Sequence, residues 1–420
     1  MERYSEYKDS GVKWLGEIPS HWEVEPFGKH FSFRKGLPIT KANLIDSGEA
    51  VISYGQIHAK ENLGTTLSES LVRYVSRDYL KSHPQCLLTK DDFVFADTSE
   101  DIGGSGNFVY NDFPANIFAG YHTIVAKQSG LYNPSYYAYL FKSECWRNHV
   151  RSMVNGVKVY SIGRKQLKSN FLLFPSYKEQ DAIVRYLDAA TSKIDKAIAM
   201  QQKMIDLLNE RKQIIIQNAV TKGIDENVEM KDSGVEWIGM IPKHWKIIRI
   251  KHLAKLQSGS NLTSNEISDT GSYPVYGGNG LRGFYGSYNC EGSYVLIGRQ
   301  GALCGNINYA EDKFWATEHA VVCYPKKKYN TLWFGEVLRL MDLGQYSLAS
   351  AQPGLAVERI KGLYMPYPSI EEQNKIALFL KQNIGKIDLY ARHCQRQITL
   401  LQERKQIIIN EVVTGKVKVS

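Results

Sequence analysis

The sequence lacks the patterns that mark membrane proteins, secreted proteins and metal-binding modules. No window approaches the roughly 18 consecutive apolar residues of a membrane span, and the opening MERYSEYKDSG has no apolar signal core. Only 6 cysteines occur in 420 residues, with no C-x-x-C pair and no histidine pair beside them at zinc spacing. We therefore expect a soluble cytoplasmic protein with free thiols, no metal site and no membrane partner.

Charge and apolar content indicate the class of partner and the number of domains. Lys and Arg number 52 against 43 Asp and Glu, which gives a net charge of +9. A basic excess favours an anionic partner, either nucleic acid or a membrane surface. An apolar fraction of 43% is enough for two ordinary cores, so two or more domains are expected.

Two blocks of sequence occur twice in the chain. The first, KDSGVKWLGEIPSHW at residues 8–22, returns as KDSGVEWIGMIPKHW at residues 231–245. The second, which runs from PSYKEQDAIVRYL to LLNERKQIIIQNAVTKG at residues 175–223, returns from residue 368 as PSIEEQNKIALFL and LLQERKQIIINEVVTGK. The segments between the blocks share little obvious sequence and differ in length. Because duplicated sequence implies duplicated structure, we expect a pseudo-twofold frame that holds two different inserts.

The second block predicts one long helix in each copy. Its apolar residues recur at heptad spacing, and polar residues interrupt the seam. The heptad positions are Leu187, Ile194, Leu208 and Ile215, with Ile183, Ala190, Ala197 and Met204, and in the second copy Leu380, Ile387, Leu401 and Ile408, with Ile376 and Tyr390. At ~1.5 Å per residue each helix would be roughly 65–70 Å long. Two such helices bury their apolar stripes most easily against each other, so we expect an antiparallel coiled-coil pair.

The inserts have the pattern of α+β domains rich in strands. Short apolar runs bounded by Gly, Pro, Asn and Asp predict strands within residues 91–98, 120–127, 292–301 and 319–325. Each insert ends in a predicted helix, one beginning at Asn133-Pro134 and running to about residue 154, the other beginning near Asn330. The expected fold is thus α+β, with two globular strand-rich domains separated by two long antiparallel helices.

The repeated motifs resemble those of one known family. The opener SGVxWxGxIPxHW, the P-S-x-x-E-Q entry into a long helix and the E-R-K-Q-I-I-I exit, each present twice around variable segments, are similar to type I restriction-modification specificity subunits. The resemblance covers essentially the whole chain. It implies target-recognition domains at residues 1–174 and 224–367, each reading half of a bipartite site in double-stranded DNA. It also implies conserved spacer helices at residues 175–223 and 368–420.

The same resemblance implies the partners and the absence of catalysis. The helices would help to bind two methyltransferase subunits, which carry S-adenosylmethionine, and a restriction and translocase subunit would complete the complex. No cofactor is expected on this chain.

Three motifs could indicate an enzyme, and each has a simpler explanation. Residues 133–136, Asn-Pro-Ser-Tyr, approach the N-P-P-Y tetrad of amino-methyltransferases, but the third residue is wrong and the position suits a helix start. The glycines at 278, 280 and 283 fit a dinucleotide loop, yet no helix pattern follows them. Glu210-Arg211-Lys212, repeated at 403–405, imitates a nuclease E-x-K but lacks an acidic partner, so interhelix ion pairs or partner contacts explain it better.

Exposed loops that carry Arg, Lys, Asn or Gln are the natural candidates for base contact, because these side chains pair with guanine and adenine edges in the major groove. The candidates in the first insert are Tyr54, Gln56, Thr98, Ser99, Lys158, Arg164, Lys165 and Lys168. Those in the second insert are Tyr276, Asn279, Arg282, Arg299 and Gln300. For each one the alternative is a solvated surface loop. The repeated Trp14, Trp22, Trp237 and Trp245 are expected to be packing anchors on the helical frame.

Two other classes of protein remain open. A self-contained modifying or restriction enzyme would need a cofactor loop or a carboxylate cluster, and we find neither motif. A coiled-coil adaptor that does not bind DNA is distinguished by the salt dependence of DNA binding, since phosphate contacts weaken steeply as salt rises.

Overall fold

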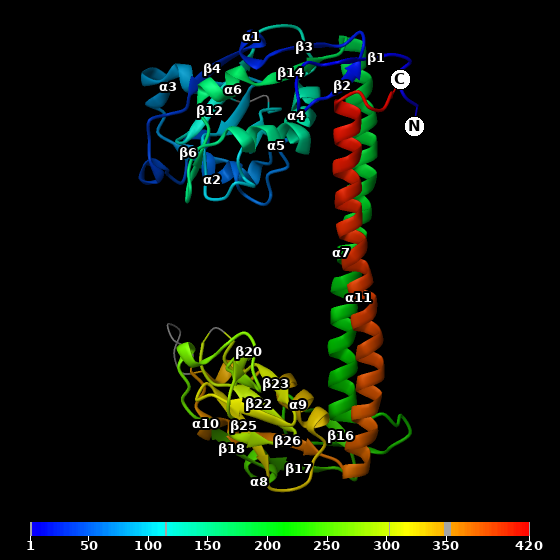
Figure 1. Cartoon of the computed structure of the whole chain (residues 1–420). Helices are drawn as coiled ribbons and strands as arrows, with labels where there is room; N and C mark the ends of the chain where they lie inside the picture. The colour runs from blue at the N-terminus through cyan, green and yellow to red at the C-terminus, as the bar shows by residue number, and fades with distance from the viewer. Residues whose placement is uncertain (1, 114–115, 302, 348–353, 420) are drawn as a thin grey trace. The chain divides into compact units, whose positions relative to one another are not determined.

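The computed structural model describes residues 2–113, 116–301, 303–347 and 354–419 and divides into two compact units (Figure 1). The first unit comprises Met1–Met200 and Gln397–Ser420, and the second comprises Gln201–Arg396. Two long helices, α7 (Tyr177–Lys222) and α11 (Ile370–Val413), each contribute one part to each unit.

Two four-stranded sheets form the globular part of the first unit. One has the strand order β10-β8-β12-β4 and is antiparallel, and the other has the order β6-β5-β11-β7 with a parallel β5-β11 pair. Their bounds are β4 (Phe31–Lys35), β5 (Glu49–Ile52), β6 (Arg73–Val75), β7 (Leu87–Leu88), β8 (Phe93–Ala96), β10 (Phe108–Tyr110), β11 (Ile117–Ala119) and β12 (Thr123–Gln128). Two-stranded ribbons pair β1 (Tyr7–Asp9) with β2 (Glu17–Pro19), β3 (Glu23–Pro26) with β14 (Phe171–Phe174), and β9 (Thr98–Ser99) with β13 (Tyr160–Ser161).

The second unit repeats this topology. Its sheets have the orders β23-β22-β25-β18 and β20-β19-β24-β21, again with one parallel pair, β19-β24. The bounds are β18 (Ala254–Ser258), β19 (Tyr273–Gly277), β20 (Gly280–Tyr285), β21 (Cys290–Glu291), β22 (Tyr294–Gly298), β23 (Ile307–Ala310), β24 (Lys313–Ala316) and β25 (Ala320–Pro325). Ribbons pair β15 (Met230–Asp232) with β16 (Met240–Pro242), and β17 (Lys246–Arg249) with β26 (Tyr364–Tyr367). The inserts therefore share a fold although their sequences have diverged, and the four predicted strands are β8, β12, β22 and β25.

Short helices complete both units. Those of four to ten residues are α1 (Phe27–His30), α2 (Tyr54–Ile57), α3 (Tyr79–Ser82), α4 (Pro134–Lys142), α5 (Glu144–Met153), α6 (Arg164–Ser169), α8 (Ile250–Leu253), α9 (Thr331–Leu340) and α10 (Val357–Lys361). The 3-10 turns are Lys41–Asn43, Glu69–Leu71, Pro84–Cys86, Ser264–Glu266 and Leu343–Tyr346.

The helix predicted over residues 134–154 is two helices, and this part of the prediction was wrong. Ser143 has an extended backbone (φ −64°, ψ 139°), which separates α4 from α5. Its hydroxyl donates to the Leu140 carbonyl at 2.6 Å, so the side chain satisfies a backbone group that a continuous helix would use. The predicted start is confirmed, because the Asn133 side chain accepts a hydrogen bond from the Ser135 backbone with Pro134 at the first helical position.

The long helices pack antiparallel within each unit, as predicted. In the first unit Lys405 Nζ lies 2.6 Å from Asp195 Oδ1, so the end of α11 faces the start of α7. In the second unit the equivalent pair, Lys212 Nζ and Asp388 Oδ1, lies 2.8 Å apart. The two lysines of the repeated E-R-K motif thus make the expected interhelix ion pairs.

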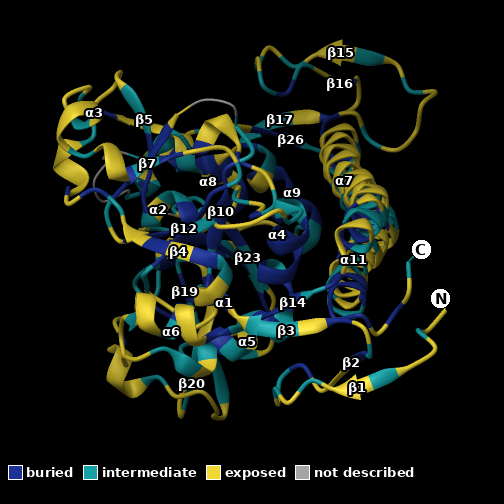
Figure 2. Ribbon diagram, turned by 90° about the horizontal axis from the view of Figure 1, so that it is seen from above, coloured by how far each residue is buried: buried dark blue, intermediate teal, exposed yellow. Residues whose placement is uncertain are grey.

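Half of the predicted seam positions are buried and most of the others are half-buried, but two are exposed. Leu187 and Leu380 are fully buried, whereas Met204 is 49% and Tyr390 63% exposed. A straight helix has 3.6 residues per turn, so a seam at 3.5-residue spacing rotates by about 20° per heptad and can leave the contact. Figure 2 shows exposed residues along much of α7.

The repeated openers anchor the globular parts to the helices. Trp22 and Trp245 are 0% and 1% exposed, and their indole N–H groups donate to Glu179 and Glu372 at 3.2 and 3.0 Å. Trp14 is half-buried at the edge of the first unit's core, and Trp237 is half-buried at the edge of the second unit's core. The predicted packing role is therefore confirmed.

Candidate nucleic-acid interface

Three loops of the second unit meet at one end of its sheets. The loops follow β19, follow β22 and precede β25, and the Arg299 N–H donates to the His319 carbonyl at 2.8 Å. They surround an open hollow of about 590 Å³ lined by Gly278, Asn279, Leu281, Arg282, Gln300, Gly301 and His319. Three of the five candidates predicted from the sequence of this insert therefore lie around one hollow, and we call this region the loop surface of the second unit.

The remaining two candidates border this surface. Arg299 is half-buried and donates to Ser258 Oγ at 3.2 Å, which fixes its guanidinium against β18. Tyr276 is half-buried on β19 with its ring centroid 5.6 Å from that of Phe314. The glycine motif at 278–283 leads into strand β20, so no helix N-terminus is available there for a phosphate.

The first unit has an equivalent loop surface. The Asp97 N–H donates to the His122 carbonyl at 3.1 Å, which is the same bond that Arg299 makes to His319. The Tyr54 ring lies 5.4 Å from the His122 ring, and His58 Nε2 lies 2.8 Å from the Thr98 carbonyl oxygen. Two candidates from distant parts of the insert, Tyr54 and Thr98, are thus brought together.

The basic segment of the first insert joins this surface through one strand pair. Ser161 pairs with Thr98 in the β13-β9 ribbon, and the Ile162 N–H donates to the Asp97 carbonyl at 2.9 Å. Lys158 is exposed in the loop before this ribbon. Arg164, Lys165 and Lys168 are exposed on α6, directly after it.

Two candidates of the first insert have their polar groups occupied. Ser99 is buried at 4% exposure, and its hydroxyl donates to the Asp101 carbonyl at 2.7 Å. Gln56 Oε1 accepts the Ser53 N–H at 3.1 Å, which caps α2. The polar groups of Ser99 and Gln56 thus bind backbone groups of the protein itself.

The sequence prediction missed a histidine on each loop surface. His122 and His319 each stand directly before the corresponding strands β12 and β25, and His122 Nδ1 lies 3.2 Å from Asp97 Oδ1. His122 has a left-handed backbone (φ 53°), a conformation that residues other than glycine adopt at a cost and that is enriched at functional sites. The sequence held a signal for these two histidines. The segments HTIV and HAVV, which they begin, lie the same number of residues before the helix-capping Asn133 and Asn330.

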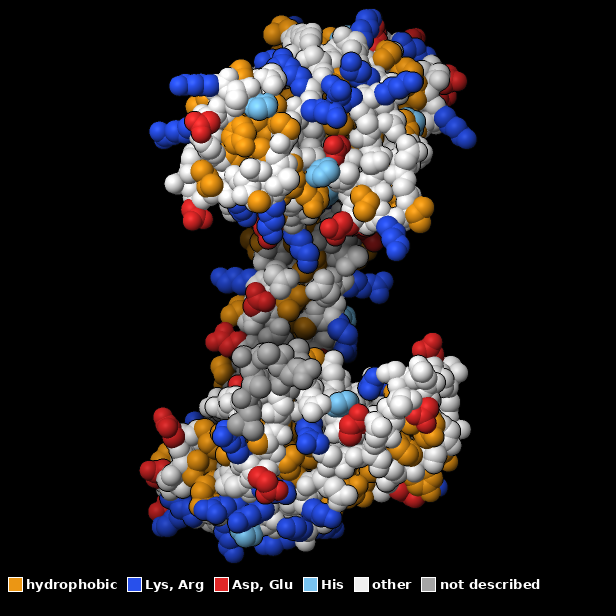
Figure 3. Space-filling view, turned by 90° about the vertical axis from the view of Figure 1, so that its left-hand side faces the viewer, with side chains coloured by type: hydrophobic (Ala, Val, Ile, Leu, Met, Phe, Trp, Pro, Cys, Tyr) orange, Lys and Arg blue, Asp and Glu red, His pale blue; other side chains and the backbone are white. Residues whose placement is uncertain are grey.

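A second basic region of the second unit also escaped prediction. Lys326, Lys327 and Lys328 are exposed after β25, at the end opposite to His319, and Lys326 Nζ donates to the Lys251 carbonyl at 3.0 Å. Figure 3 shows lysine and arginine side chains gathered along this rim of the unit, where α8 lies.

The described residues contain no candidate metal site and no candidate membrane-spanning helix. Within residues 2–113, 116–301, 303–347 and 354–419, no group of three His, Cys, Asp or Glu side chains is placed to hold a metal ion. No helix in these ranges is long and apolar enough to cross a membrane. All six cysteines are free, and three of them are buried.

Comparison with known proteins gives one family. The family model described as the type I restriction modification DNA specificity domain matches residues 19–204 and again residues 242–400. The chain is 37% identical over 161 residues to the Escherichia coli type I restriction enzyme EcoprrI specificity subunit, a match that spans 36% of this chain and 40% of that subunit. It is 24% identical to the putative MjaX specificity subunit of Methanocaldococcus jannaschii over 98% of both chains.

Solved structures with the same fold are also found. A chain from a structure described as the basis of complex assembly and conformational transition of the type I R-M system superposes with a TM-score of 0.72 at 13% identity, covering 95% of this chain and 99% of that one. The HsdS subunit from Thermoanaerobacter tengcongensis superposes with a TM-score of 0.51 at 13% identity, covering 95% and 98%. Two matches to the family model, one on each repeat, cover most of the sequence. The chain therefore belongs to the type I restriction-modification specificity family, whose members are non-catalytic DNA-recognition subunits.

Proposed function

We propose that the chain recognises a bipartite site in double-stranded DNA, with each unit reading one half through its loop surface. The bases would be read by Tyr54, Thr98 and His122 in the first unit, and by Asn279, Arg282, Gln300 and His319 in the second. Exposed Lys158 and the basic residues of α6 would contact phosphates. Phosphate contacts set position and affinity, whereas base-edge contacts set sequence preference.

One observation carries this proposal. The two units have the same strand order and the same backbone bond to a histidine carbonyl, yet the residue that donates it is Asp97 in one and Arg299 in the other. Asp97 is acidic and Arg299 is basic, so equivalent positions of the two loop surfaces carry side chains of opposite charge. A common scaffold with divergent polar loops fits two independent readers of different half-sites.

We further propose that the repeated helices bind two methyltransferase subunits, which would carry S-adenosylmethionine, and that a restriction and translocase subunit completes the complex. Exposed apolar side chains support this, because they occur in equivalent pairs: Leu207 and Leu400 are 50% and 46% exposed, and Ile214 and Ile407 are 50% and 54% exposed. Exposed apolar residues at matching positions of two repeats favour a partner that binds twice.

The neighbourhood of one such residue supports the same proposal. In the first unit Ile407 borders an open hollow of about 840 Å³, together with Lys142, Glu403 and Lys405. Burial lowers the pKa of Lys142 to about 8, with the nearby Lys405 adding to the effect. A polar rim around an apolar centre is the usual composition of a protein interface.

The experiment is to sequence methylated DNA from cells that express this chain together with its methyltransferase. We expect one motif with two specified blocks separated by a fixed number of unspecified bases. A single uninterrupted block would contradict the proposal of two readers. DNA mobility shifts across a salt series test the alternative of an adaptor, which would show no salt-dependent binding.

A further inference from the structure

Each long helix begins at a cluster of three polar side chains that is repeated in the two units. In the first unit His21 Nε2 lies 2.8 Å and Trp22 Nε1 3.2 Å from Glu179 Oε1. In the second unit His244 Nε2 and Trp245 Nε1 lie 2.7 and 3.0 Å from Glu372 Oε1. The two clusters have the same residue types and the same hydrogen bonds.

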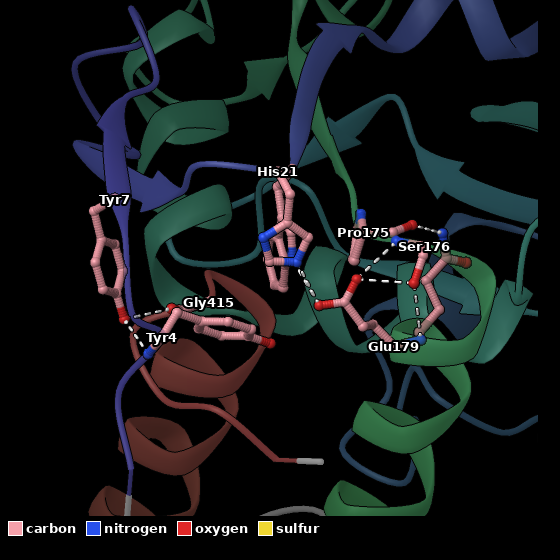
Figure 4. Close-up of polar contacts among 9 residues, drawn as sticks. Tyr4, Tyr7, His21, Pro175, Ser176, Glu179 and Gly415 are labelled. Atoms are coloured by element: carbon pink, nitrogen blue, oxygen red, sulfur yellow. Dashed lines mark hydrogen bonds and ion pairs between the residues drawn. The ribbon is translucent and has the colours of Figure 1, made fainter.

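In the first unit an aromatic ring covers this cluster. The Tyr4 ring lies 5.9 Å from the Trp22 ring in an edge-on arrangement and 5.6 Å from the His21 ring. Figure 4 shows Tyr4, Tyr7 and His21 beside Glu179. The segment is fixed by Tyr7, whose hydroxyl accepts the Tyr4 N–H at 3.2 Å and donates to the Gly415 carbonyl at 3.1 Å. Burial, together with the neighbouring Glu179 carboxylate, raises the pKa of Tyr4, so its hydroxyl stays protonated at neutral pH.

Among the described residues of the second unit, no aromatic ring other than that of Trp245 and the His244 imidazole lines the corresponding place. A hollow of about 240 Å³ lies against Trp245, His244 and Glu372, and its further lining is Lys222, Gly223, Ile224, Asp225, Val228, Pro242, Lys375 and Ile376. The offset between the two sequence repeats that relates Trp22 to Trp245 also relates Tyr4 to Asn227. Asn227 is exposed. The linker KGIDENVEM at residues 222–230 contains no aromatic residue that could fill the hollow.

The hollow has the size and chemistry for one ring. A cavity of about 150 Å³ is enough to hold benzene, so 240 Å³ accommodates a phenol. Trp245 and the apolar Ile224, Val228 and Ile376 would contact the ring, while the partly exposed Glu372 carboxylate could accept from a hydroxyl. Ile224 is 42% exposed, which leaves apolar surface uncovered at this place.

We propose that this hollow binds a tyrosine side chain presented by an extended peptide segment of a partner protein, seated as Tyr4 is seated in the first unit. Trp245 and His244 pack against the ring and Glu372 accepts its hydroxyl. The ligand class follows from the occupant of the equivalent place in this same chain. It does not depend on the proposed DNA recognition.

The test is fluorine NMR of the full chain labelled with 5-fluorotryptophan, titrated with N-acetyl-tyrosine methylamide. The Trp245 resonance, assigned through W245F, should shift saturably, with a dissociation constant on the order of 1 mM because so small a ligand makes few contacts. The Asn227→Tyr variant, which supplies a ring within the chain, should abolish the shift. The Tyr4→Ala variant should add a second saturable shift, at Trp22.

Each outcome decides the proposal. No shift of Trp245 in the wild type, or an unchanged shift in Asn227→Tyr, would overturn it. A parallel titration with p-cresol separates a peptide-borne ring from a free phenol: binding of p-cresol alone would refute the peptide ligand. Binding of N-acetyl-tyrosine methylamide at Trp22 of Tyr4→Ala, but not at Trp245, would show that the second hollow cannot take the ring.

Discussion

At the scale of single residues, the two units place different side chains on equivalent backbone positions. Asp97 and Arg299 make the same backbone bond, but Asp97 is paired with His122 whereas Arg299 is held by Ser258. Side chains of opposite charge on one scaffold fit the proposal that the two units have independent half-site preferences. Individual residues of the loop surface can therefore be tested one half-site at a time.

We predict that Arg282→Ala weakens binding to the cognate site and relaxes base preference at one position of the second half-site. A bidentate arginine contact is worth about 1–3 kcal/mol of discrimination, so the preference should fall roughly 5-fold to 150-fold. Competition binding with substituted second half-sites measures this. The matched control, Lys326→Ala with Lys327→Ala at the opposite end of β25, should leave base preference intact. Loss of preference in the control and not in Arg282→Ala would place the interface at the other end.

We also predict an acid dependence that arises at the helix starts. Partial burial alone would raise the pKa of Glu179, but hydrogen bonds from His21, Ser176 and Trp22 outweigh it and keep the pKa below its ordinary value. The pKa of Glu372 is lowered in the same way. A lowered pKa in the folded state stabilises the protein above the unfolded value of about 4.3, and this contribution is lost as the pH falls through the folded value.

The measurement is the free energy of unfolding as a function of pH. Replacing Glu179 and Glu372 with glutamine should make the chain less stable at neutral pH and should flatten the loss of stability between about pH 5 and pH 3. An unchanged pH slope in the double variant would contradict the role given to these carboxylates.

At the scale of elements, periodic and repeated features were predictable and local breaks were not. The long helices, their antiparallel pairing and the Trp anchors follow from heptad spacing and from duplication, which act over many residues at once. The break at Ser143 depends on one hydroxyl bond, and the exposure of Met204 on accumulated helix rotation, and neither leaves a pattern in the sequence. The shared topology of the inserts was hidden because strands retain a fold through burial rather than residue identity.

The candidate site was predictable in part for a related reason. Glycine-rich loops with Arg, Asn and Gln identified most of the second loop surface, since these residue types suit base edges. Which loops meet is set by strand order, so the convergence of Tyr54, Thr98 and His122 could not be predicted from their positions in the chain. Ser99 and Gln56 have side chains suited to base edges, but these side chains are already hydrogen-bonded to the backbone of nearby residues.

The long helices offer a test at this same scale, on the proposal that they set the gap between half-sites. Deleting residues 200–206 and 393–399, which are equivalent in the two repeats, removes one heptad from each helix and keeps the Asp195–Lys405 and Lys212–Asp388 pairs. The helices shorten by about 10 Å, which corresponds to roughly 3 base pairs if they run along the DNA. Methylome sequencing should report a shorter gap with unchanged half-sites. An active variant with the original gap would rule out this role of the helices.

At the scale of the whole molecule, the segments near the two ends of the sequence are hydrogen-bonded to each other. The Lys418 N–H donates to the Glu2 carbonyl at 2.9 Å within the first unit, beside the cluster where α7 begins. Both inserts are thereby held in equivalent frames, each made from an opener, the start of one long helix and the end of the other. Such an arrangement leaves each insert free to change without altering the frame.

The most direct test of the central claim, that the two units are independent readers, is an exchange of one insert. Residues 31–171, which begin at β4 and end where β14 begins, are replaced by the same segment of a related specificity subunit, and the methylated motif is sequenced. The account predicts that one half of the motif changes while the other half and the gap stay the same. A change in both halves, or in neither, from an active complex would contradict it.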